Sequence, residues 1–475
     1  MREQPITILG GGLAGCEAAW RAAQAGLAVE LIEMRPAAMT PAHQTDRLAE
    51  LVCSNSLKSE WLDDASGLLK QEMRSLGSLV LSCAERHRVP AGSALAVDRV
   101  GFAEEVTRAI QEHPLIRLVR QEAAELPAAR PLIVATGPLT SDRLAADLAD
   151  RFAAFLAPPP SNREPGTVNL EPQHLDPRPS NLLHFYDAIS PIIAADSIDG
   201  GVVFRAARYG KGGADYLNCP FTRDEYQSFR TALLGGERYP LHAFEDPRYF
   251  EGCLPVEELA ERGEDALRFG PMRPVGLEDP RTGKRPFAVV QLRQEDRGAG
   301  GRSTMYNLVG FQTRLRRPEQ VRAIRLIPGL QQAEILRYGS VHRNTFVMAP
   351  KLLDNSLQYR GESGVIFAGQ LTGVEGYLES AATGILAGIN AVRHVRGEPL
   401  VAPPPSTMLG GLLRYLTTAH AASFQPINAN FGLLPALSTV VADRQERNRC
   451  HVERATMDFG SWRDGAGILA VSGPV

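Results

Sequence analysis

The chain opens with apolar runs whose spacing changes from strand to helix and back. Residues 5–11, PITILGG, form a short apolar run that ends in glycines. Residues 13–26 are rich in alanine and have apolar positions at helical spacing, and residues 27–33, LAVELIE, form a second apolar run. The pattern predicts a βαβ unit.

The same pattern returns much later in the chain. A third strand is predicted at residues 131–137, and residues 364–392 hold a further strand and helix. Between them lie a Pro-rich stretch at 157–166 and β-like runs such as 200–210 and 286–293. We therefore predict an α/β fold in which a Rossmann-type FAD- or NAD-binding domain is split in sequence by an inserted α+β domain.

The end of the chain has a different texture. A Pro-rich break at residues 401–407 precedes helical stretches, and the last twenty residues are rich in glycine, which is typical of a mobile tail. The expected parts are residues 1–160 and 335–450 for the split domain, 161–334 for the inserted domain and 451–475 for the tail.

Composition narrows the function classes only a little. The 475 residues include 51 Lys or Arg and 54 Asp or Glu, a net charge of −3, which indicates no general nucleic-acid or membrane partner. Without a membrane-length apolar run or a signal-peptide pattern, we expect a cytoplasmic protein with no membrane partner. The cysteines, at positions 16, 53, 83, 219, 253 and 450, lack metal-ligand spacing, so no metal site is expected.

The glycines after the first strand match the dinucleotide-binding pattern GxGxxG. Gly10 permits the tight turn, Gly12 lets the backbone approach a pyrophosphate, and Gly15 lets helix and strand pack closely. Glu33, at the end of the second strand, is placed to bind ribose hydroxyls. The residues expected to bind the cofactor are Gly10, Gly11, Gly12, Leu13, Ala14, Gly15 and Glu33.

FAD is preferred to NAD as the cofactor because of a second group of glycines. Residues 369–376, GQLTGVEG, precede a predicted helix, so their backbone donors can reach the ribityl and pyrimidine side of a flavin. Gly369, Gly373 and Glu375 are the residues expected to take part. A glycine-rich turn that binds nothing is the alternative, and the complete βαβ context argues against it.

One segment carries positive charge that the whole chain lacks. Residues 268–325 hold thirteen Lys or Arg against five Asp or Glu, a local net charge of +8. Arg314, Arg316 and Arg317 lie there with aromatic residues interleaved, a mixture that suits phosphates and stacked bases of RNA. A solvated basic face is the alternative explanation.

Seven blocks of sequence carry a resemblance to a known family. They are GGGLAGCEAAW, LVCSNSLKS, ARYGKGGADYLNCP, GPMRPVGL, YNLVGFQTRL, GSVHRNTF and GQLTGVEGYLESAATG. Together they resemble the TrmFO family of folate- and FAD-dependent tRNA uracil-5-methyltransferases, relatives of the larger GidA proteins. The resemblance covers most of residues 5–445. The chain departs from it at Cys16, in a longer stretch near 157–180 and in the tail beyond 450.

The resemblance implies an activity. It implies methylation of C5 of the T-loop uridine at tRNA position 54, with methylenetetrahydrofolate as carbon donor and FAD, reduced by NADH or NADPH, as reductant. It also places His342, Arg343 and Asn344, in an expected GSVHRNTF loop, at the flavin and folate pocket. On the sequence alone, a solvated polar loop explains these three residues equally well.

Uracil C5 is a poor nucleophile, so its methylation generally needs a thiolate that adds at C6. Cys219 precedes Thr222 and Glu225, a predicted capping box, and the positive end of the following helix would favour its thiolate. Cys53 precedes a polar stretch that is predicted to cap a helix over residues 57–73. The sequence alone favours inert thiols, whereas the resemblance implies that both are functional. We expect Cys219 to attack and Cys53 to assist, and spacing leaves this division open.

Two other functions fit parts of the sequence. One is a flavin-dependent NAD(P)H oxidoreductase acting on a small substrate such as a quinone. The other is a flavin-containing tRNA-binding factor without transfer activity. Loss of methylation with retained FAD after replacement of Cys219 would separate an enzyme from such a factor.

Overall fold

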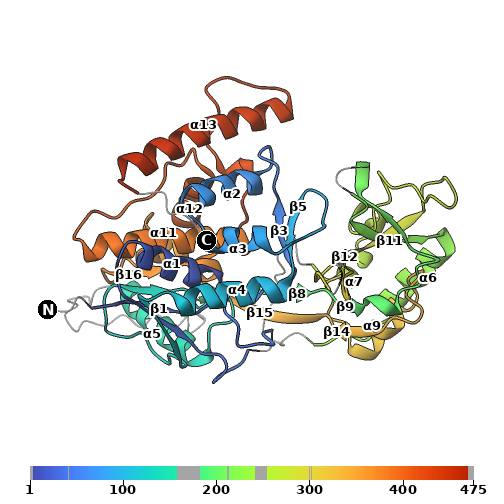
Figure 1. Cartoon of the computed structure of the whole chain (residues 1–475), viewed down its shortest axis with the longest axis horizontal. Helices are drawn as coiled ribbons and strands as arrows, with labels where there is room; N and C mark the ends of the chain where they lie inside the picture. Colours follow the sequence, from blue (N-terminus) through green and yellow to red (C-terminus); the bar gives the residue numbers. More distant parts are fainter. Residues whose placement is uncertain are drawn as a thin grey trace, which may run out of the picture.

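The computed structural model describes residues 4–40, 42–157, 182–210, 213–240, 254–298, 300 and 302–468. The Pro-rich stretch near 157–180 therefore lies almost entirely outside the described residues. Figure 1 shows two lobes, one holding β1, β16, α1 and α11 and the other holding β11, β12 and α6, with β8 and β15 between them.

The first lobe is built on a five-stranded parallel sheet with the order β16-β7-β1-β2-β6. Its strands are β1 (Ile6–Leu9), β2 (Val29–Glu33), β6 (Ile116–Arg120), β7 (Leu132–Val134) and β16 (Val365–Phe367). β16 comes more than 200 residues after β7 and still pairs with it in parallel. This confirms the Rossmann-type domain that is split in sequence.

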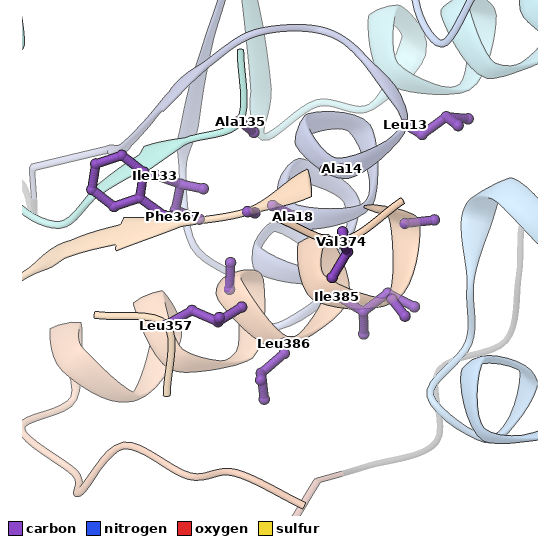
Figure 2. Close-up of a cluster of buried hydrophobic side chains, with 14 of the residues drawn as sticks. Leu13, Ala14, Ala18, Ile133, Ala135, Leu357, Phe367, Val374, Ile385 and Leu386 are labelled. Carbon is purple, nitrogen blue, oxygen red and sulfur yellow. The ribbon is translucent and has the colours of Figure 1, made fainter. Parts of the chain in front are cut away.

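Two helices pack together against this sheet. They are α1 (Leu13–Gln24) and α11 (Tyr377–Val395). Figure 2 shows Ala14 and Ala18 of α1 in one buried cluster with Ile385 of α11. A Cβ added at Gly384 would collide with the Ala14 backbone, and one at Gly388 would lie 2.8 Å from the Ala18 carbonyl oxygen. The small residues thus let the two halves of the split domain meet backbone to backbone.

Further helices and a small sheet cover this core. The helices are α2 (Ala65–Ser75), α3 (Leu79–Arg86), α4 (Arg99–Glu112), α5 (Asp142–Leu156), α10 (Ala349–Leu352), α12 (Met408–Thr418) and α13 (Arg444–Gly465). The sheet has the order β3-β5-β4, with β3 (Ser56–Ser59), β4 (Arg88–Val89) and β5 (Ala94–Val97).

The second lobe is a six-stranded sheet with flanking helices. The strand order is β10-β11-β12-β13-β9-β14, and every pair is antiparallel. The strands are β9 (Ile192–Ala194), β10 (Phe204–Ala206), β11 (Tyr216–Phe221), β12 (Ala288–Gln294), β13 (Met305–Leu308) and β14 (Ile335–Arg337). The helices are α6 (Arg223–Leu234), α7 (Val256–Glu261), α8 (Ala266–Phe269) and α9 (Arg317–Ile324). This lobe is the inserted α+β domain.

A two-stranded antiparallel ribbon joins the lobes. β8 (Leu182–Ile189) enters the inserted domain and β15 (Ser340–Val347) leaves it. The prediction that GSVHRNTF forms a loop is therefore wrong, because Ser340 to Phe346 belong to β15. Pairing with β8 satisfies their backbone groups.

Two other local predictions are also wrong. The helix expected over 57–73 begins only at Ala65, because residues 56–59 pair with β5 instead. The tail expected from 451 is helical as far as Gly465, and Ala455 and Phe459 of α13 are buried against the first lobe. In Figure 1 this helix lies along α2.

Candidate functional site

The glycine loop has the backbone geometry that its sequence predicts. Gly10 has a positive φ of 97°, and a Cβ there would collide with the Ala135 carbonyl oxygen. A Cβ at Gly15 would collide with the Gly10 carbonyl oxygen. Gly12, the N-cap of α1, has open space where its Cβ would be. The turn and helix start thus leave a cradle in which backbone N–H groups can meet an anion.

Glu33 is held by the loop that it follows. The Gly11 N–H donates to one Glu33 carboxylate oxygen at 2.6 Å, and the Arg35 guanidinium donates to the other at 2.8 Å. Burial opposes ionisation, but the Arg35 hydrogen bond and charge outweigh it and lower the pKa of Glu33. Glu33 is therefore a fixed carboxylate at the floor of the loop, which suits an acceptor for ribose hydroxyls.

A pocket opens above this loop, and we name it the glycine-loop pocket. Among the predicted cofactor residues, those lining it are Gly10, Gly12, Leu13, Ala14, Glu33 and Gly369. The Thr136–Thr140 turn after β7 also lines it. The pocket brings residues from both halves of the split domain together, as a dinucleotide such as FAD requires. Its glycine cradle and fixed carboxylate fit that group.

Four predicted cofactor residues do not line the pocket but contact or shape the residues that do. Gly11 and Gly15 shape the loop. Gly373, at a positive φ of 96°, ends the 3-10 turn Gly369–Thr372. Glu375 is buried and accepts a hydrogen bond of 2.5 Å from Gln370, which does line the pocket. Burial, reinforced by the nearby Asp187 charge, raises the pKa of Glu375.

Cys53 lies at the edge of the glycine-loop pocket. Its backbone N–H donates to the Tyr377 hydroxyl oxygen at 2.8 Å, and the Ser54 N–H donates to the same oxygen at 3.2 Å. Tyr377 lines the pocket and is the first residue of α11. Tyr377 is not among the residues predicted from the sequence. It directly follows the glycine block GQLTGVEG, and this position is the feature of the sequence that could have identified it.

The Cys53 thiol is half-buried among positive charges. Its sulfur lies 3.9 Å from the Ala188 carbonyl oxygen of β8. The guanidiniums of Arg99 and Arg337 both interact electrostatically with it. A half-buried sulfur in electropositive surroundings is the setting in which reactive cysteines are found, so this position suits a nucleophile.

Cys219 lies in a very different place. The capping box of Thr222 and Glu225 is confirmed at the start of α6. However, Cys219 belongs to β11, and its side chain is completely buried in the apolar core of the inserted domain. Burial raises the pKa of this thiol. The prediction of a reachable, thiolate-favouring Cys219 is therefore wrong for this structure, because strand direction, not distance along the chain, decides where the sulfur points.

A second cavity of about 580 Å³ lies where the ribbon meets the inserted domain. We name it the arginine pocket because Arg314, Arg317, Arg337 and Arg343 line it. Tyr186, Tyr239, Tyr338 and His342 complete its principal lining. Burial, followed by the charge of Arg337, lowers the pKa of His342 to about 4. The pocket therefore offers a neutral imidazole among cationic and aromatic side chains.

The two pockets adjoin at one short segment. His43 lines the glycine-loop pocket, and its neighbour Gln44 lines the arginine pocket. Cys53 lines neither pocket but contacts the walls of both. Its N–H donates to Tyr377, which lines the glycine-loop pocket, and its sulfur lies against Ala188, the register partner of Val341 in the arginine pocket. Asn344 is buried in β15 and lines neither of these two pockets.

The basic segment is partly neutralised in the folded chain. Arg314 pairs with Glu258 at 2.6 Å, and Arg316 pairs with Glu237 at 3.2 Å and lies over the Tyr239 ring. Both carboxylates lie outside residues 268–325, so a count along the chain overstates the local charge. Arg317 lies over the Tyr338 ring and is one of the cations of the arginine pocket.

Comparison with known proteins shows the family to which the chain belongs. A family model described as glucose inhibited division protein A matches residues 5–399. A Geobacter sulfurreducens protein named methylenetetrahydrofolate–tRNA-(uracil-5-)-methyltransferase TrmFO is 53% identical over 458 residues, covering 96% of this chain and 98% of that protein. The chain belongs to the TrmFO family. A second TrmFO relative, from Heliobacterium modesticaldum, is 52% identical over 95% of this chain and 96% of its own length.

Solved structures support the fold of this TrmFO family member. The structure of Aquifex aeolicus GidA in the form II crystal superposes with a TM-score of 0.65, at 16% identity, over 99% of this chain and 74% of that one. Among the described residues, no helix is long and apolar enough to cross a membrane. Within the same residues, no cluster of three or more His, Cys, Asp or Glu is arranged to hold a metal ion.

Proposed function

We propose that this chain methylates C5 of the T-loop uridine at position 54 of tRNA, the reaction class named for its relatives. The carbon comes from methylenetetrahydrofolate, and FAD reduced by NADH or NADPH is the reductant. The observation that carries the proposal is the position of the half-buried Cys53 between a residue of the glycine-loop pocket, Tyr377, and the ribbon strand that pairs with Val341 of the arginine pocket. A thiol at such a junction can reach substrates held in both pockets.

The glycine-loop pocket suits FAD. Gly10, Gly12 and the N-terminus of α1 would hold its pyrophosphate, and Glu33 its ribose. When bound, FAD supplies the two electrons that convert a methylene group into a methyl group. Tyr377 and Gln370 would border its reactive end, because both line the pocket near the Cys53 loop.

The arginine pocket suits the folate. The neutral His342 ring offers a flat surface for a pterin, and Arg317, Arg337 and Arg343 offer charged donors for the carboxylates of the glutamate part. The junction at His43 and Gln44 keeps the one-carbon unit close to the flavin site.

Cys53, rather than Cys219, is the proposed nucleophile. Its sulfur forms a bond to C6 of the uracil, and the resulting electron density at C5 attacks the one-carbon unit of the folate. C5 then loses its proton, tetrahydrofolate leaves, and two electrons and a proton complete the methyl group. The bond between sulfur and C6 breaks last, which restores the thiolate. The guanidiniums of Arg99 and Arg337 interact electrostatically with this sulfur.

The deciding experiment is a methylation assay with labelled methylenetetrahydrofolate, NADH or NADPH, and tRNA. We expect label at the T-loop uridine, and we expect Cys53→Ala to abolish it while the protein keeps its flavin absorbance. With tRNA containing 5-fluorouridine, which cannot lose its C5 substituent as a proton, the trapped adduct should map to Cys53 in the wild type and in Cys219→Ala. Methylation that needs S-adenosylmethionine, or an adduct at Cys219, would contradict the proposal.

A further inference from the structure

We propose that Tyr209 is a stacking platform for an unpaired base of the RNA substrate, on the end of the inserted sheet that faces the Cys53 loop. This inference rests on the proposed function, since it names a second contact between the same tRNA and this chain. Tyr209 lines neither the glycine-loop pocket nor the arginine pocket.

The backbone at Tyr209 is strained. The residue lies in the 3-10 turn Arg208–Gly210 with a φ of 59° and a ψ of 21°, a left-handed conformation that residues other than glycine rarely adopt. Such strain persists only where the surroundings fix it, and it is frequent at ligand-binding positions. Here the Tyr209 N–H donates to the Gly276 carbonyl oxygen at 2.9 Å. Arg208 anchors the turn by donating to the Gln291 side chain at 2.7 Å and to the Arg273 carbonyl oxygen.

The Tyr209 ring is supported on one side and open on the other. A Cβ at Gly276 would lie 2.8 to 3.0 Å from three ring atoms, so the ring rests directly on the Gly276 backbone. Position 276 requires glycine for two reasons: its φ of +83° and the lack of room for a Cβ beneath the Tyr209 ring. Tyr209 is nevertheless 57% exposed to solvent. A large aromatic ring that is held in place and turned to solvent is the arrangement used to stack single-stranded bases.

Two sequence blocks of the family resemblance meet at this contact. Tyr209 belongs to ARYGKGGADYLNCP, and Gly276 belongs to GPMRPVGL. They lie more than 60 residues apart in the chain. The two blocks therefore form one structural unit, in which the Tyr209 ring packs on Gly276.

The sheet register places Tyr209 on the same side as Cys53. Tyr209 follows the end of β10, where Ala206 pairs with Tyr216 and Tyr216 pairs with Arg293 of β12. Arg293 donates to the Asn55 side chain at 2.8 Å, two residues from Cys53. Adjacent strands lie about 4.8 Å apart, so the step from β12 to β10 is about 10 Å. Tyr209 lies three residues beyond Ala206, and the Arg293 side chain spans the gap to Asn55, so several nucleotides that flank a base at Cys53 would bridge the separation.

Charge around the ring favours a nucleic acid as the occupant. Arg208 precedes Tyr209, and Arg273 interacts electrostatically with Arg208. Of the two carboxylates that follow Gly276, Asp279 is paired with Arg281 at 2.7 Å and Glu278 is exposed to solvent. An aromatic face beside cations matches the alternation of bases and phosphates in single-stranded RNA.

The test measures RNA binding by the flavin-loaded protein. A T-arm stem-loop RNA is labelled for fluorescence anisotropy, and Tyr209→Leu is compared with Tyr209→Phe. We expect the leucine variant to bind roughly five- to hundredfold more weakly and the phenylalanine variant to bind within about twofold of wild type, because the ring face and not the hydroxyl makes the contact. Trp61→Leu is the matched control, since Trp61 is 48% exposed but is followed by Asp63 and Asp64. It should leave binding unchanged.

A second measurement keeps the test decisive if Tyr209→Leu fails to fold. 2-Aminopurine is placed at each unpaired loop position in turn, and one position should lose fluorescence on binding to wild-type protein and to Tyr209→Phe. The slope of affinity against salt should stay unchanged in Tyr209→Leu and fall by about one in Arg273→Gln, which loses a phosphate contact. No quenching at any position, or unchanged affinity of the leucine variant, would overturn the proposal. Quenching without methyl transfer would instead count against the proposed function alone.

Discussion

At the scale of single residues, one phenol links the two parts of the proposed active site. The Tyr377 hydroxyl oxygen accepts the N–H groups of Cys53 and Ser54 and also borders the glycine-loop pocket. Two hydrogen bonds therefore connect the wall of this pocket to the Cys53 backbone. His342 of β15 lines the arginine pocket, and its lowered pKa keeps the ring neutral.

The neutral state of His342 leads to a prediction about pH. Burial, then the charge of Arg337, lowers the pKa of His342 from 6.5 to about 4. Because the folded value lies below the unfolded one, this residue contributes stability that is present above about pH 6.5 and is lost as the pH falls toward 4. His342→Phe should flatten that part of the acid-unfolding curve.

The same pKa shift predicts how folate binding responds to pH. Between about pH 6 and pH 8 the ring should stay neutral, so folate affinity should not show a histidine titration in this range. An NMR titration of the His342 ring protons measures the pKa directly. A midpoint near the ordinary histidine value would contradict both statements.

At the scale of elements, the contact of α1 with α11 holds the split domain together. The two helices come from opposite ends of the sequence, and their closest approach depends on glycines facing Ala14 and Ala18. The N-termini of the same helices carry the glycine cradle and Tyr377. Their packing therefore sets the geometry of the glycine-loop pocket.

Replacing one of these glycines tests the contact. Gly384→Ala should destabilise the protein by about 1–3 kcal/mol and weaken FAD retention, because its Cβ would collide with the Ala14 backbone, which cannot rotate away. Gly460→Ala in α13 is the matched control, since nothing lies within 4 Å of its Cβ position. It should leave the thermal midpoint unchanged or raise it. Equal effects of the two changes would show that helix propensity, not packing, decides.

At the scale of the whole molecule, a few polar contacts orient the two lobes. Arg99 of α4 donates to Glu295, which follows β12, at 2.8 Å, and Arg293 of β12 donates to Asn55. Arg99 also donates to the Leu51 carbonyl oxygen, just before Cys53. The contacts that join the lobes therefore also hold the proposed nucleophile.

Removing the buried carboxylate tests this arrangement. The Glu295 side chain is 1% exposed, so Glu295→Ala leaves Arg99 buried without its counter-charge and should cost about 3–5 kcal/mol. Glu104→Ala breaks an exposed ion pair with Arg47 and should cost at most about 1 kcal/mol. Chemical denaturation measures both changes. Similar small losses would show that the lobes are held by other contacts.

The amino-acid sequence determined the features that depend on neighbouring residues. The glycine loop, the βαβ unit, the later strand and helix at 364–392 and the Thr222 capping box all follow from backbone preferences and apolar spacing within a few residues. The family resemblance added the reaction class, because several separate blocks had to match together.

Only the tertiary structure decided which groups meet and which are buried. Cys219 and Cys53 look alike in sequence, but a strand carries the first into the apolar core and a phenol holds the second at the pocket junction. Arg314 counted as an unpaired charge in the sequence and is neutralised in the fold by Glu258 of α7. Burial, charge pairing and the contact of Tyr209 with Gly276 all depend on residues distant in the chain, which local patterns do not encode.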